Sequence, residues 1–185
     1  MGLFGRSGTA RGALRSFGVE SSAALGLVLA LNGCASGPRF DGSEYHGDQV
    51  AFRLGQLPTD LRRVDSSDAL LTFQDDDNGA TWAINARCGL DGDDVPLRAL
   101  VQHLFLQFTS REQLSEKPLR LDEREALEVE IQASIDGVPR RFLVVVLKKD
   151  GCVYDFIHVD RGGDAPELVQ SRDEFRAVVS GFRTL

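Results

Sequence analysis

Residues 127–147 read LEVEIQASIDGVPRRFLVVVL, and this stretch decides the fold. Its first part is apolar at every second position, at Leu127, Val129, Ile131, Ala133 and Ile135. Side chains alternate between the two faces of a strand, so this spacing predicts a strand with one buried and one wet face. Asp136-Gly137 predicts a hairpin turn into residues 141–147. That second segment is apolar on both faces, which predicts a central strand.

Four further segments extend the sheet along the chain. Alternating or continuous apolar patterns predict strands over residues 49–55, 69–74, 80–88 and 152–159. Asn78-Gly79 separates the second and third of them, and this pair between apolar runs predicts a hairpin. In the run 80–88, the side chains predicted to share one face are Trp82, Ile84, Ala86 and Cys88.

Two segments have helical spacing instead. Over residues 96–108 the apolar stripe consists of Leu97, Leu100, Val101, Leu104 and Phe108. Asp93 and Asp94 precede it and suit a helix N-terminus. Near the end of the chain, Ser171 and Glu174 fit a capping box that opens a second helix. Its predicted apolar stripe is Phe175, Val178, Val179 and Phe182.

Hairpin-linked strands with two helices predict an α+β fold, a layered antiparallel β-sheet of about six strands with two covering helices. Residues 48–185 resemble the PsbP family, the extrinsic photosystem II proteins and their bacterial relatives. The segments that carry this resemblance are the first strand followed by Leu57-Pro58 and Leu61-Arg62-Arg63-Val64, the meander from Leu127, and the closing EFRAVVSGF. The resemblance implies an α/β/α sandwich with an accessory or binding role, and it does not imply photosynthesis.

The first 33 residues resemble a bacterial lipoprotein signal peptide. A start rich in Gly, Arg and Ser precedes an apolar run at residues 22–31, too short to span about 30 Å of hydrocarbon but typical of a signal-peptide core. Leu31-Asn32-Gly33-Cys34 then resembles the lipobox, in which the cysteine becomes the acylated first residue. The resemblance implies a lipid anchor at Cys34 in the bacterial envelope. Ala35, where Asp would mark inner-membrane retention, favours the outer membrane.

Residues 34–48 are polar and contain several Gly and Ser, which predicts a flexible tether before a single domain over residues 49–185. The chain carries a formal charge of −7, and residues 1–33 contribute +2 through three arginines and Glu20, so the rest carries −9. Nucleic-acid binders normally present a basic surface, so that class is excluded. An acidic body also does not adhere to anionic lipid. The membrane affinity must therefore come from the anchor.

With Cys34 acylated, Cys88 and Cys152 remain as a pair. In an oxidising envelope they could form a disulfide, which would close a loop of about 65 residues and contribute roughly 3–4 kcal/mol. Two buried free thiols are the alternative, and the sequence leaves both open. A nucleophilic role needs a basic or helix-terminal neighbour, which the sequence does not indicate for either cysteine.

The sequence predicts no metal or cofactor site. Residues 75–77 are interpreted as a turn and the acidic residues of 91–94 as a helix start, because neither cluster has the calcium-loop spacing that ends in a glutamate. The histidines lack the paired spacing of zinc ligands, and we expect all of them on the surface or at a rim. They are His46, His103 and His158.

No catalytic residue is predicted either. The chain has no G-x-S-x-G motif, so Ser171 is interpreted as a helix cap. Asp155 interrupts an apolar strand and needs a partner, such as a backbone N–H or an arginine, if its face is covered.

Three functions remain open from the sequence. The favoured one is a non-enzymatic, lipid-anchored envelope protein whose domain binds an envelope protein or a small ligand. It predicts an exposed apolar patch or an open groove beside the meander. An envelope hydrolase would instead need a cleft where a Cys, His or carboxylate pair converges within hydrogen-bond reach. A structural surface spacer would have neither pocket nor partner.

Overall fold

The computed structural model describes residues 37–89 and 94–185, all within one compact unit. The predicted signal peptide and Cys34 lie outside the described residues. The helices are α1 (Leu97–Leu104) and α2 (Pro166–Ser180). The strands are β1 (Arg39–Phe40), β2 (Glu44–His46), β3 (Ala51–Arg53), β4 (Leu61–Val64), β5 (Leu71–Asp75), β6 (Thr81–Cys88), β7 (Thr109–Leu121), β8 (Arg124–Ile135), β9 (Val138–Lys149), β10 (Cys152–Asp160) and β11 (Arg183–Thr184).

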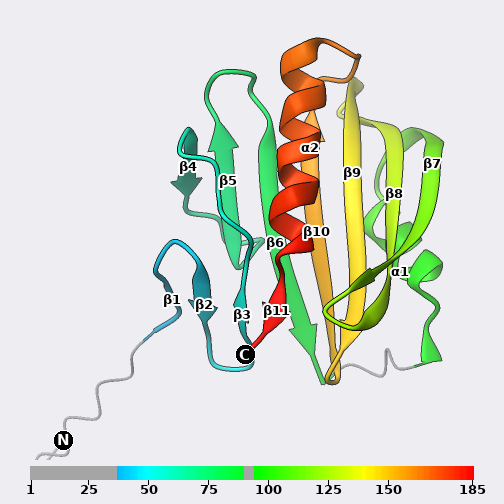
Figure 1. The fold of residues 1–185 in the computed structure, drawn as a ribbon. Helices are drawn as coiled ribbons and strands as arrows, with labels where there is room; N and C mark the ends of the chain where they lie inside the picture. Colours follow the sequence, from blue (N-terminus) through cyan, green and yellow to red (C-terminus); the bar gives the residue numbers. More distant parts are fainter. Residues whose placement is uncertain (1–36, 90–93) are drawn as a thin grey trace, which may run out of the picture. The chain divides into compact units, whose positions relative to one another are not determined.

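The strands form two antiparallel sheets, so the prediction of one sheet of about six strands is wrong in number. The larger sheet has seven strands in the order β4-β5-β6-β10-β9-β8-β7, and the smaller has four in the order β1-β2-β3-β11 (Figure 1). The α+β class with two helices is confirmed. The additional strands are either very short or, like β7, exposed at a sheet edge with no buried face to impose an apolar alternation.

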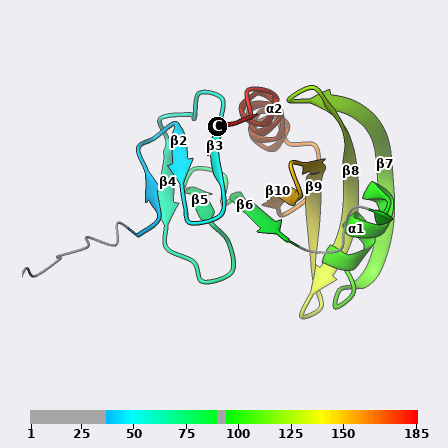
Figure 2. The same cartoon turned by 90° about the horizontal axis from the view of Figure 1, so that it is seen from below.

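The two helices cover opposite faces of the seven-stranded sheet, as Figure 2 shows from below. Strand β9 separates the two cores because its side chains alternate between them. Leu143, Val145 and Leu147 pack in the cluster that includes α2. Phe142, Val144 and Val146 pack in the cluster that includes α1. The central position predicted for residues 141–147 is therefore confirmed.

Hairpins form at the predicted Asn78-Gly79 and Asp136-Gly137 turns, and a further one forms at Asp150-Gly151. Asp136 and Gly137 have φ angles of 51° and 80°, and Asp150 and Gly151 have 53° and 73°. Positive φ at both central residues is the geometry of a type I′ turn, whose twist matches that of the flanking strands. These turns set the register in which β8 pairs with β9 and β9 pairs with β10.

The tether predicted over residues 34–48 does not extend through that range in the folded unit. Strands β1 and β2 lie within it, β1 pairing with β2 and β2 with β3. Tyr45 is 3% exposed and stacks on Phe52 with a ring-centroid distance of 5.0 Å. Burial of this aromatic side chain stabilises the small sheet. The range was predicted to be a tether because a single tyrosine among polar residues forms no apolar pattern that indicates a strand.

The N-terminal caps of both helices differ from the prediction, although α1 begins at Leu97, close to the predicted residue 96. The N-cap position of α1 is Pro96, with no side-chain cap hydrogen bond, so an Asp cap is not formed. Helix α2 begins at Pro166, upstream of Ser171, because proline fixes φ and its missing N–H costs nothing in the first turn. Ser171 therefore lies inside the helix. The predicted stripe is nevertheless buried, at Phe175, Val178 and Val179.

Within residues 37–89 and 94–185, neither helix has the length and apolar character needed to cross a membrane.

Candidate functional site

An open groove lies between the C-terminal end of α1 and strands β7 and β8. Its volume is about 420 Å³. The lining residues are Gln102, Phe105, Leu106, Arg111, Gln113 and Ile131. This is the open groove beside the meander that the favoured function requires.

The base of the groove is apolar and well packed. Phe105 is 3% exposed and Ile131 is 8% exposed. The Phe105 ring meets those of Phe108 and Phe142 at centroid distances of 5.2 and 5.0 Å, the second edge to face. Such aromatic packing fixes the position of Phe105. Leu106, the next residue, is 68% exposed, so the groove has a rigid base and an uncovered apolar wall.

The polar side of the groove comes from an irregular part of β7. The pairing of β7 with β8 shifts register between Thr109 and Glu112 and again between Gln113 and Ser115. Ser110 has a φ of 51°, a conformation that is uncommon for residues other than glycine. Bulges redirect side chains. Arg111 and Gln113, which line the groove, lie within this irregular segment.

The groove is locally cationic although the folded part of the chain is acidic. None of its lining residues is a carboxylate. Arg111 has no carboxylate of the described residues within ion-pair distance, and its Nη1 donates to the Phe105 carbonyl oxygen at 3.1 Å. Glu116, which follows this segment on β7, is paired with Arg98, whose Nε donates to its carboxylate at 3.1 Å.

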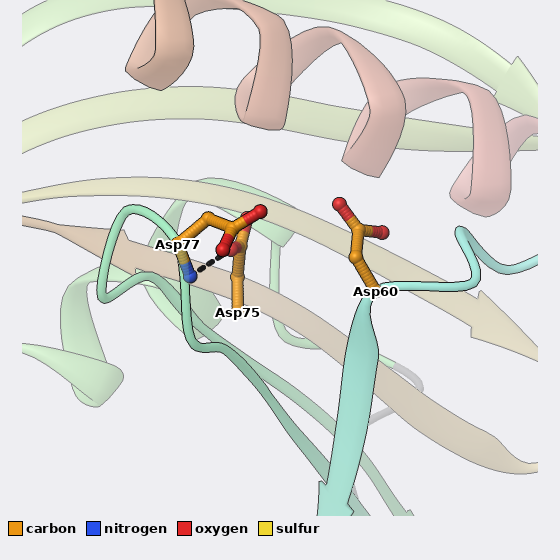
Figure 3. A group of neighbouring side chains, drawn as sticks. All are labelled: Asp60, Asp75 and Asp77. Atoms are coloured by element: carbon orange, nitrogen blue, oxygen red, sulfur yellow. Dashed lines mark hydrogen bonds between the residues drawn. The ribbon is translucent and has the colours of Figure 1, made fainter.

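An acidic cluster lies elsewhere, at the turn between β5 and β6. Carboxylate oxygens of Asp60, Asp75 and Asp77 lie within 4.8 Å of one another (Figure 3). Oxygen ligands of this kind suit hard cations such as Ca²⁺. However, Asp75 Oδ1 already accepts the backbone N–H groups of Asp77 and Asn78 at 3.0 and 3.3 Å, which makes it a turn-forming group.

The predicted turn over residues 75–77 is thus confirmed, and Asp60 is an addition that the sequence did not reveal. Asp60 joins the cluster because Leu61 pairs with Asp75 across β4 and β5. That cross-strand register depends on tertiary pairing, and no local pattern in the sequence announces it.

A second polar group is buried between β10 and α2. His158 is fully buried, so the expectation of a surface or rim position is wrong. Its ring packs against Trp82 and Phe175, at centroid distances of 6.1 and 5.6 Å. His158 Nε2 lies 3.1 Å from Ser171 Oγ, and Asp160 Oδ2 accepts from Arg172 Nη1 at 2.6 Å.

The same residue types as in a hydrolytic Ser-His-Asp triad occur here, in Ser171, His158 and Asp160. Their geometry instead favours a structural role, in which they connect β10 to α2. His158 Nδ1 is 3.7 Å from Asp160 Oδ2, which exceeds hydrogen-bond length. Ser171 is only 1% exposed, so its hydroxyl is not presented to a substrate. Burial lowers the pKa of His158 to about 4, which keeps the ring neutral near pH 7.

Asp155 has the arginine partner that its position in the strand demands. The side chain is 1% exposed, and Asp155 Oδ2 accepts from Arg87 Nη2 at 2.7 Å. Asp155 Oδ1 has no hydrogen-bond partner among the described residues. Burial raises the pKa of Asp155, and the Arg87 charge acts in the opposite direction. This pair joins β6 to β10.

Cys88 and Cys152 are joined by a disulfide in the structure. They face each other in register at the end of β6 and the start of β10. Of the two states that the sequence left open, the structure has the bonded one. Cys34 lies outside the described residues.

A further cavity of about 430 Å³ borders Cys152 at the turns that follow β7 and β9. It is lined by charges of both signs, including Arg124, Glu125 and Lys149. Lys149 is already paired with Asp122 at 2.6 Å. This mixed lining indicates no single ligand chemistry, unlike the groove beside α1.

No protein-family model and no curated protein matches the chain. Solved structures share its fold. The cyanobacterial PsbP protein (CyanoP) from Synechocystis sp. PCC 6803 has a TM-score of 0.53 and 13% identity, covering 84% of this chain and 99% of that protein.

LpqN, a protein involved in cell envelope biogenesis of Mycobacterium tuberculosis, has a TM-score of 0.51 and 17% identity. The match covers 75% of this chain and 87% of LpqN. Identities this low establish the architecture alone. The chain therefore has a PsbP-like fold.

Proposed function

We propose that this chain is a non-enzymatic, lipid-anchored protein of the bacterial envelope whose domain binds an envelope protein or a small ligand. The observation that carries the binding role is the groove of about 420 Å³ between α1 and strands β7 and β8. It combines an apolar base with a few polar groups at its edge, which is the usual composition of a ligand site.

The envelope location is supported by the lipobox-like residues 31–34 and by the basic, apolar leader before them. LpqN shares the fold and is involved in cell envelope biogenesis. The disulfide between Cys88 and Cys152 is consistent with an oxidising compartment. Ala35 after the cysteine favours the outer membrane.

The anchor is tested by growing cells with a clickable fatty acid and isolating the protein. We expect label on the wild type and none on the Cys34→Ser variant, because the thiol is the acylation site. Labelled Cys34→Ser protein, or a mature wild-type chain that begins elsewhere than residue 34, would contradict the anchor.

The binding role is tested by photo-cross-linking in the intact envelope. A photoreactive residue at Leu106 should give a discrete adduct, because this side chain is 68% exposed at the groove. The same residue at Leu185, which is 57% exposed and outside the groove, is the matched control. Equal adducts at both positions, or none at either, would remove the groove as the binding site.

A further inference from the structure

We propose that the groove between α1 and strands β7 and β8 binds a single-chain fatty acid. Its hydrocarbon tail lies against Phe105, Leu106 and Ile131, and its carboxylate lies on Arg111. This inference rests on the binding role proposed above and names the ligand class for the same site.

The apolar half of the argument comes from the three side chains that face the groove. Phe105 and Ile131 are nearly covered by the core of the domain, whereas Leu106 is 68% exposed. A hydrocarbon chain in the groove removes Leu106 from water without disturbing the packed base. Because the Phe105 ring is held by Phe108 and Phe142, the surface is formed before the ligand arrives.

The charge of the groove selects an anionic head group. Arg111 is the one ionic side chain among the lining residues, and it has no described carboxylate within ion-pair distance. Its Nη1 donates to the Phe105 carbonyl oxygen, and no other hydrogen bond among the described residues uses its guanidinium donors. Guanidinium groups bind carboxylates through short, charge-assisted hydrogen bonds. The amide of Gln102 supplies further donors, whereas Gln113 Nε2 already donates to Glu116 Oε2 at 3.4 Å.

The size of the groove and the charge of the body favour one free chain over a membrane lipid. A volume of about 420 Å³ is at the small end of ligand sites. An anionic bilayer would also meet the net charge of −9 carried by residues 34–185, which opposes adsorption. A dissolved fatty acid brings a single charge to a single arginine.

The test uses the full chain with Cys34→Ser, titrated calorimetrically with laurate below its aggregation concentration. Dodecanol, with the same chain length and no charge, is the matched ligand. We expect saturable binding of laurate that Arg111→Gln weakens about tenfold, as expected for loss of a charge-assisted hydrogen bond. Dodecanol should bind both proteins equally. Arg140→Gln, a partly exposed arginine of β9 outside the groove, should change nothing.

Leu106→Ser should weaken both ligands, and thermal unfolding of each variant checks that it is folded. If laurate and dodecanol bind equally and Arg111→Gln has no effect, the fatty-acid assignment is overturned. A Leu106→Ser effect in that case would still support the groove as a binding site. Absence of laurate binding, or binding only to anionic phospholipid vesicles, also overturns the assignment, while the adduct at Leu106 tests the binding role separately.

Discussion

His158 makes the fold sensitive to acid. Its imidazole is fully buried beneath α2, and burial is the main reason why its pKa falls from 6.5 to about 4. The charges of Arg172 and Arg176 lower this pKa further, whereas Asp160 and Asp75 oppose the shift. The folded protein therefore holds a neutral ring in a range of pH where an unfolded chain would protonate it.

This difference predicts that stability falls as the pH drops from about 6.5 to about 4. The unfolded state binds more protons across that window, and the linked loss reaches up to about 3 kcal/mol. Urea denaturation between pH 7.5 and 4 measures it. His158→Gln should flatten the pH dependence, and His103→Gln, at an exposed position, should preserve it. An unchanged slope in His158→Gln would assign the acid sensitivity to other groups.

Asp155 and Arg87 form an ion pair, and we expect substitution of Arg87 to destabilise the fold more than substitution of Asp155. Asp155 is buried and has a raised pKa, so its ionised form is costly and is tolerated because Arg87 lies beside it. Because the folded-state pKa of Asp155 is raised, this carboxyl makes the protein less stable as the pH increases. The stability associated with its protonated form is lost as the pH rises through the folded-state pKa.

At pH 7, Arg87→Leu is predicted to lower the free energy of unfolding by about 3 kcal/mol, because it leaves a buried carboxylate without its partner. Asp155→Asn should cost much less, since it removes the buried charge itself. In the double variant Asp155→Asn should recover most of the loss, which a double-mutant cycle in urea would measure. Strictly additive effects would show that the pair is not coupled.

Among the elements, β6 and β10 are joined by the Cys88–Cys152 disulfide, which links residues 64 positions apart. Restricting the unfolded chain over such a loop contributes roughly 3–4 kcal/mol. We therefore predict a loss of this size for the double variant Cys88→Ala and Cys152→Ala, measured by urea denaturation without reductant. A reductant should lower the stability of the wild type and leave the double variant unchanged. A wild type unaffected by reductant would contradict a stabilising disulfide.

Some elements could be predicted from patterns within a few residues of the sequence, and others could not. Residues 127–147 were predictable because alternation and an Asp-Gly turn are written within a few positions. Strand β7 was missed, since it is exposed along most of its length and has no buried face to impose a period of two. Ser171 was misassigned because Pro166 starts the helix earlier than the capping box suggested.

At the scale of the whole molecule, the α/β/α arrangement with one helix on each face of the sheet was expected from the PsbP resemblance. The groove was expected only as an open groove or apolar patch beside the meander, without its residues. Its residues come from α1, β7 and β8, and Gln113 meets Ile131 through a cross-strand register that follows a bulge. Bulges and register depend on pairing across the sheet. For the same reason no local pattern around Arg111 predicts that it lies in an apolar groove.

The charge of the whole molecule makes a prediction about how it is held at a membrane. Residues 34–185 carry −9, so an anionic bilayer repels the body and the proposed acyl anchor at Cys34 must supply the attachment. Hydrophobic anchoring is not weakened by salt, whereas attraction between surface charges is screened within about 3 Å at 1 M. Washing isolated membranes with 1 M NaCl should therefore leave the acylated protein bound while peripheral basic proteins are released. Release of this protein by the salt wash would mean that surface charge, through a basic patch or a basic partner, holds it in place.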